Sequence, residues 1–110
     1  MNNIKTFGNF KKQDIFVNII NNDIQSLKNY INSGHDLNIE NNYGYTPLMY
    51  ACVYNKIEVI ELLLKHGVDV NKQTIYRETA LFFAYAHGNN SLEIIKMLLD
   101  AGADINKQNY

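Results

Sequence analysis

The sequence predicts an all-α solenoid, in which helix-turn-helix units stack side by side and short hairpin loops join them. The first observation is an internal period: Gly34 recurs 33 residues later as Gly67, and Gly102 follows 35 residues after that. The second is that an apolar stretch with helical spacing precedes each of these glycines. A helix pair this small cannot bury its apolar face alone, so we expect the copies to stack into one continuous core.

Length and composition are consistent with one small domain. The chain has 110 residues, of which 46% are hydrophobic, and its net charge of −1 provides no basic field for nucleic acid or anionic membrane. No apolar run approaches the roughly 20 residues that span a bilayer. Cys52 is the single cysteine, which excludes an internal disulfide and a Cys-rich zinc site and is compatible with a reducing cytoplasm, the location we expect.

The spacing of the copies defines the expected organisation. Between the second and third copies the period grows by two residues, which places an insertion between Tyr85 and Glu93, where Gly88, Asn89 and Asn90 favour a longer turn. We expect an N-terminal tail at 1–13 and a repeat domain at 14–110, with repeats at about 14–40, 41–73 and 74–106 and a stub at 107–110.

The first two copies predict helix pairs. In the first copy, apolar residues recur at helical spacing from Ile15 through Leu27 and Ile31, and Gly34 ends the pattern. In the second, Thr46 is a good N-cap and Pro47 suits the first helical position, so a helix begins there and ends near Asn55. A second helix from about Ile57 carries an apolar face and ends at Gly67, a left-handed cap.

The third copy repeats this order of elements. A Leu-rich run that ends at Gly102 predicts its second helix. Short polar stretches, 38–45 and 69–73, separate the helix pairs and predict turns or protruding hairpins.

The residues resemble the ankyrin repeat. Residues 41–71 read NNYGYTPLMYACVYNKIEVIELLLKHGVDVN and follow that family's pattern of Gly, Thr-Pro-Leu, Ala, a Leu run, Gly, Asp and Asn. The third copy matches in ETALFFAY and SLEIIKMLLDAGADIN. The first, DIFVNIINNDIQSLKNYINSGHDLN, is similar to an N-terminal capping repeat without its hairpin. The resemblance implies an ankyrin-repeat solenoid over residues 14–110.

Several residues depart from the family's pattern. Arg77 stands where the family has a turn glycine, so this hairpin either holds Arg in a left-handed conformation, at about 1 kcal/mol, or adopts another turn. Ala80 replaces the proline, and Met49 and Phe82 replace a histidine whose side-chain hydrogen bond ties neighbouring repeats. We therefore expect lower stability than in a consensus array. We also expect an uncapped C-terminal end, with either an exposed apolar flank or a longer parent array.

Catalytic and metal sites are not expected. His35, His66 and His87 lack the spacing for a metal site or a Cys-His pair with Cys52, which matches a small buried residue. Three carboxylates, Glu58, Glu61 and Glu93, fall on solvated helical faces, and no cofactor is implied. Two alternatives exist for Asn71 and Asn106: hydroxylation by an asparaginyl hydroxylase, which the resemblance implies is possible, or a structural tie to the hairpin backbone, which we favour.

The expected function is non-catalytic binding of a protein partner. The resemblance implies that hairpin tips and first helices form a concave strip that faces the partner. Tyrosine suits such a surface because it offers a large rigid area and a hydroxyl, although Tyr30, Tyr50 and Tyr85 lie at expected packing positions. The expected partner-binding residues are Glu40, Asn42, Tyr43, Tyr45, Val53, Tyr54, Gln73, Ile75, Tyr76, Glu78, Ala86 and His87.

A second hypothesis is that the chain is a truncated remnant of a longer array without an independent binding role. The missing C-terminal cap, Arg77 and Ala80 motivate it. We expect no nucleic-acid or membrane partner, and either a monomer or weak self-association through the uncapped C-terminal end.

Overall fold

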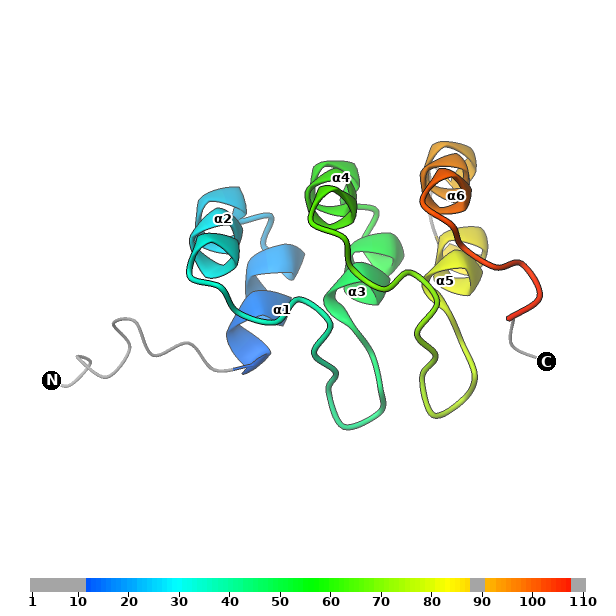
Figure 1. Ribbon diagram of the computed structural model, residues 1–110, viewed down its shortest axis with the longest axis horizontal. Coiled ribbons are helices and arrows are strands. Elements are labelled where there is room, and N and C mark those ends of the chain that lie inside the picture. Colours follow the sequence, from blue (N-terminus) through cyan, green and yellow to red (C-terminus); the bar gives the residue numbers. More distant parts are fainter. Residues whose placement is uncertain (1–11, 88–90, 108–110) are drawn as a thin grey trace, which may run out of the picture.

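Three helix pairs stand in a row in the computed structural model, which describes residues 12–87 and 91–107 (Figure 1). The first helices of the pairs lie in one layer and the second helices in another. Within the described residues there is no strand, which confirms the predicted all-α solenoid. The helices are α1 (Lys12–Ile20), α2 (Ile24–Asn32), α3 (Pro47–Val53), α4 (Ile57–Lys65), α5 (Ala80–His87) and α6 (Ser91–Asp100).

Helix α3 begins where the sequence predicts it. The Thr46 hydroxyl accepts a hydrogen bond from the Met49 N–H at 3.3 Å, and Pro47 occupies the first turn. The Met49 sulfur accepts a bond from the Thr46 N–H at 3.4 Å. Thr79 caps α5 in the same way by accepting from the Phe82 N–H at 3.2 Å. The cap thus survives the replacement of the family's histidine, because the threonine supplies its acceptor in both repeats.

Left-handed residues end the helices and shape the turns. Gly67 follows α4 with a φ of 75°, as predicted for a glycine cap. Asn22 and Asn55 adopt φ values near 60° between the helices of a pair, a conformation that asparagine tolerates well. Arg77 has a φ of 65°. Of the two alternatives for its hairpin, the structure therefore shows the left-handed one.

The core lies between the helix pairs. Helix α3 packs against both α1 and α5, and α4 packs against α6. The second helices contribute fully buried side chains in every repeat, including Leu27, Leu63 and Leu98. The core is shared between repeats, so each helix pair depends on its neighbours to bury its apolar side chains.

The loops that precede α3 and α5 are hairpin-shaped and touch each other. The Asn41 N–H donates to the Tyr45 carbonyl at 3.0 Å, and the Thr74 N–H donates to the Glu78 carbonyl at 2.9 Å. Between the hairpins, the Ile75 N–H donates to the Tyr43 carbonyl at 3.0 Å. These bonds fix the two hairpin tips relative to one another.

An asparagine ladder joins the loops that follow the second helices. The Asn38 side chain accepts from the Asp69 N–H at 2.8 Å, and that of Asn71 accepts from the Asp104 N–H at 2.7 Å. Asn71 also donates to the Gly102 carbonyl at 3.1 Å. These bonds support the structural alternative for Asn71.

The expected insertion cannot be compared with the structure, and the expected packing of Tyr85 is not observed. The insertion at Gly88, Asn89 and Asn90 lies outside the described residues. Tyr85, expected at a packing position, is 79% exposed, so that expectation is wrong. The equivalent residues of the other repeats, Ile19 and Cys52, are fully buried. Among the described residues, no following helix pair covers Tyr85.

Candidate protein-binding surface

The expected binding residues lie on the two hairpins and on the adjoining faces of α3 and α5. Four carry large apolar groups and are exposed, namely Tyr43, Tyr54, Ile75 and Tyr76. Large exposed side chains of this kind are not required by the helix core, and aromatic groups are enriched where proteins bind each other.

A cavity lies between the first hairpin and α3. It has a volume of about 310 Å³ and is lined by Asn41, Tyr43, Tyr45, Tyr50, Val53 and Tyr54; we call it the tyrosine hollow. The rings of Tyr50 and Tyr54 have centroids 6.1 Å apart, as do those of Tyr45 and Tyr50, which meet edge to face. The hollow is therefore walled by aromatic faces and edges and suits a side chain of a partner.

Asn41 organises this hollow. Its side-chain oxygen accepts from the N–H groups of Tyr43 and Tyr45, each at 3.0 Å, and its amide nitrogen donates to the Tyr50 hydroxyl at 3.3 Å. Sequence reasoning missed this residue. The available signal was an asparagine three residues before Gly44 in a turn, a position where asparagine commonly bonds nearby backbone.

Tyr45 and Glu78, both expected binding residues, are half-buried and bonded to each other. The Tyr45 ring packs against Phe83 at 5.3 Å, and its hydroxyl donates to the Glu78 carboxylate at 3.5 Å. Burial and the nearby Glu78 charge raise the pKa of Tyr45. Glu78 also accepts from the Thr74 hydroxyl at 3.1 Å. The pair joins neighbouring repeats beneath the surface.

Two polar members of the expected set have partners within the chain. The Glu40 carboxylate pairs with the Lys72 ammonium at 2.8 Å, and this hydrogen bond raises the pKa of Lys72. Such a partly exposed pair adds little stability. Gln73 donates to the Arg77 carbonyl at 3.3 Å.

The rest of the set lies on the first hairpin and along α3 and α5. Val53 lines the tyrosine hollow. Asn42, Ala86 and His87 are exposed, and the His87 ring stacks near Phe83 with centroids 6.1 Å apart.

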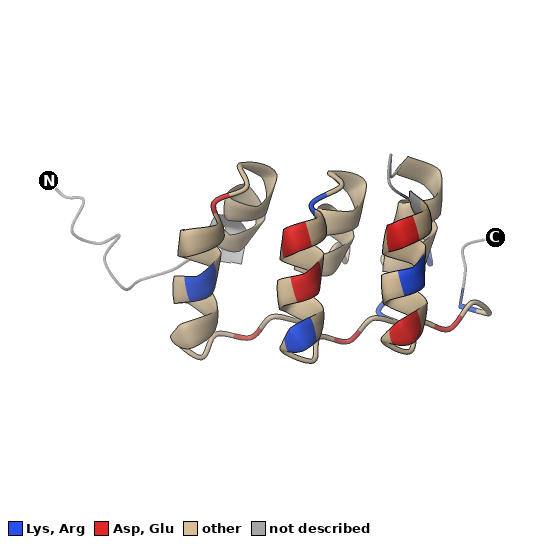
Figure 2. Cartoon of the chain, turned by 90° about the horizontal axis from the view of Figure 1, so that it is seen from above, with Lys and Arg blue, Asp and Glu red and all other residues tan. Residues whose placement is uncertain are grey.

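Charge is concentrated on the other layer of the solenoid. Figure 2 shows acidic and basic positions along α4 and α6, while the sequences of α3 and α5 contain no Asp, Glu, Lys or Arg. The acidic candidates Glu58, Glu61 and Glu93 belong to this charged layer and are exposed. The faces of α3 and α5 therefore offer contact area without desolvation of ions, and the charges of the candidate surface, such as Glu40 and Glu78, lie on the hairpins.

The described residues contain no cluster of three His, Cys, Asp or Glu that could hold a metal ion. Cys52 is fully buried, and this burial raises the pKa of its thiol to about 12. A nucleophilic thiolate requires the opposite shift. Among the same residues, no helix has the length and apolar character needed to cross a bilayer.

The raised pKa of Cys52 predicts a pH dependence of stability. The ordinary pKa of a cysteine thiol is 9.0. Between about pH 9 and 12 the unfolded chain therefore loses a proton that the folded chain keeps. Stability should therefore fall as pH rises through this window, by up to about 1.4 kcal/mol per pH unit. Urea unfolding at several pH values measures the slope. Cys52→Ala should show a shallower slope, and parallel slopes for the two proteins would contradict the burial argument.

Comparison with known proteins places the repeats in a family. A family model described as ankyrin repeats (3 copies) matches residues 15–109. The chain belongs to the ankyrin repeat family. Ankyrin repeats generally serve as protein–protein interaction modules and are generally not enzymes.

Several similar proteins are longer than this chain. Inversin of Gallus gallus is 34% identical over 83 residues, which cover 74% of this chain and 8% of inversin. A putative ankyrin repeat protein of Rickettsia bellii (strain RML369-C) is 33% identical over 72 residues, covering 60% of this chain and 43% of the relative. A putative ankyrin repeat protein of Fowlpox virus (strain NVSL) is 50% identical over 48 residues, 43% of this chain and 9% of the relative. The chain therefore spans less than half the length of each.

Proposed function

We propose that this chain binds a protein partner through its hairpin tips and the concave face of its first helices, with the tyrosine hollow as the anchoring site. The observation that carries the proposal is the hollow itself, an aromatic-walled cavity of about 310 Å³ whose lining contains no ionic side chain. The exposed Ile75 and Tyr76 extend the apolar contact to the next hairpin.

Binding through this surface needs little rearrangement of the chain. Asn41 already holds Tyr43, Tyr45 and Tyr50 through hydrogen bonds. A partner that inserts an apolar or aromatic side chain would find the hollow largely formed, which lowers the entropic cost of binding. The face of three repeats supports a modest interface, so we expect micromolar affinity.

The triple variant Tyr43→Ala, Tyr54→Ala and Tyr76→Ala tests this proposal. All three side chains are exposed, so the variant should keep its helical circular-dichroism signal. Peptides selected from a random phage-displayed library on the unmodified chain should bind this variant at least about tenfold more weakly, because exposed tyrosines are frequent hot spots. Titration calorimetry with the selected peptides measures the change. Tyr45 is left intact because it packs between repeats.

Tyr85→Ala is the matched control, since Tyr85 is an exposed tyrosine outside the candidate surface. It should leave the affinity of the selected peptides unchanged. If the peptides bind the triple variant as well as the unmodified chain, the hollow is not the binding site. If selection enriches no peptide, the hypothesis of a remnant without a binding role gains support.

A further inference from the structure

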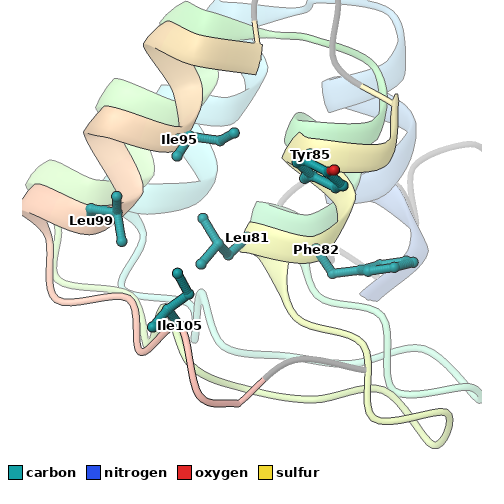
Figure 3. A pocket seen from close by; sticks show the side chains of 6 residues that line it. All are labelled: Leu81, Phe82, Tyr85, Ile95, Leu99 and Ile105. Carbon is teal, nitrogen blue, oxygen red and sulfur yellow. The ribbon is translucent and has the colours of Figure 1, made fainter. Parts of the chain in front are cut away.

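The C-terminal end of the solenoid presents a second apolar cavity, separate from the tyrosine hollow. It has a volume of about 310 Å³, and its lining comes from α5, α6 and the segment that follows α6 (Figure 3). Tyr85 is 79% exposed, Leu99 44% and Ile105 58%. We call this surface the end face; its residues are Leu81, Phe82, Tyr85, Ile95, Leu99 and Ile105.

The middle repeat shows what covers such a face. Tyr85 has the register position of Cys52, and Ile105 that of Val70. Cys52 is 0% exposed and Val70 is 7% exposed. In the middle repeat a following helix pair packs on this side, with α5 against α3 and α6 against α4. The same positions are therefore buried or exposed according to whether a helix pair follows.

The turn that carries each ladder asparagine recurs beside the end face. Asn38 and Asn71 each accept a hydrogen bond from an aspartate N–H of the next repeat. Asn106 has the same register position, and its N–H donates to the Asp104 side chain at 2.9 Å, as that of Asn71 does to Asp69. Asn106 is exposed. Beside the exposed apolar side chains of the end face, the chain thus forms the same Asp–Asn turn that precedes a further helix pair at Asn71.

The first repeat offers the complementary side of this interface. Val17 has the register position of Tyr50 and Phe83, and it is 51% exposed. Tyr50 and Phe83 pack against the preceding repeat unit, Tyr50 at 4.6 Å from the Phe16 ring and Phe83 at 5.3 Å from the Tyr45 ring. Asp36 has the register position of Asp69 and Asp104, whose N–H groups complete the ladder.

We propose that the end face binds the first repeat of a second copy of this chain, head to tail, in the register of the internal repeat interfaces. The proposal is independent of the partner-binding function, which uses the hairpins and the faces of α3 and α5. It rests on continuity: within the described residues, both halves of an interface that the repeats form twice internally are exposed, one at Val17 and one at the end face. Such a heterologous contact is not closed by symmetry, so association extends beyond dimers as concentration rises.

Sedimentation of the 110-residue chain tests the proposal. The mean mass should increase with protein concentration up to about 1 mM, where even a contact with a Kd of about 1 mM is half-formed. Tyr85→Glu at the end face and Val17→Glu in the first repeat should each weaken self-association at least tenfold, because either change buries a charge at the contact. Tyr76→Glu, an exposed hairpin residue, is the control and should associate normally.

Mixing the two variants decides the geometry. Tyr85→Glu keeps an intact first repeat and Val17→Glu keeps an intact end face, so an equimolar mixture should form 1:1 dimers and nothing larger. A Val17→Glu variant that self-associates like the unmodified chain would overturn the proposal in favour of two end faces in contact. An unmodified chain that stays monomeric at 1 mM would overturn it as well. If circular dichroism shows that Tyr85→Glu is unfolded, Leu99→Glu provides the same test.

Discussion

Leu63→Ala is expected to lower the free energy of unfolding by about 2–5 kcal/mol. Leu63 lies on α4 and is fully buried in the shared core. Truncation removes apolar contacts and leaves a cavity that the surrounding helices fill incompletely. Because α3 and α4 are packed against neighbours on one or both sides, damage to the middle repeat weakens burial in the adjacent pairs as well.

The loss is large compared with the whole stability of a domain of this size, about 5–15 kcal/mol. A thermal melt followed by circular dichroism should show a decrease in Tm of roughly 10 °C or more. Leu92→Ala is the control, because Leu92 is 82% exposed and loses little on truncation. Equal decreases for the two variants would show that Leu63 is not part of a continuous core.

The fold is predictable because each repeat contains local sequence signals for the starts and ends of its helices. Thr46 and Pro47 define the start of α3, and Gly67 defines the end of α4. These signals act within a few residues and need no tertiary information. Arg77 shows the limit of such reasoning, because the sequence leaves two backbone conformations open for it. The structure has the left-handed one, in a hairpin that is bonded to its neighbour through the Ile75 N–H and the Tyr43 carbonyl.

The candidate surface is less predictable, since exposure depends on contacts between repeats. Tyr43 and Tyr45 are two residues apart on one hairpin, yet Tyr43 is exposed and Tyr45 packs against Phe83 of the next repeat. Likewise, Tyr85 has a packing register but is exposed, because exposure is set by the presence of a following helix pair. Asn41 contributes to the tyrosine hollow partly through a hydrogen bond to Tyr50, nine residues away. Hairpin propensity alone does not reveal this contact.

The close approach of the two hairpins predicts a second large effect, at Gly44. Its φ of 83° is a conformation that side chains rarely adopt, and a Cβ built on it would lie 3.0 Å from the Thr74 Cα and 3.2 Å from the Ile75 nitrogen. Both neighbours are backbone atoms, so the hairpins would have to separate. The bond from the Ile75 N–H to the Tyr43 carbonyl lies at this same point. Gly44→Ala should therefore combine backbone strain with overpacking, for a loss of about 2–4 kcal/mol.

Gly67→Ala separates the two contributions. Gly67 has a similar φ of 75°, but a Cβ there would meet no atom within 4 Å. This variant should lose only the conformational part, about 1 kcal/mol, and urea unfolding of both variants gives the difference. Gly44→Ala should also weaken the binding of selected peptides, because Tyr43 and Tyr45 flank the glycine in the tyrosine hollow; Gly67→Ala should not. Equal destabilisation by the two substitutions would mean that the hairpins do not approach each other as closely as the 3.0 Å distance requires.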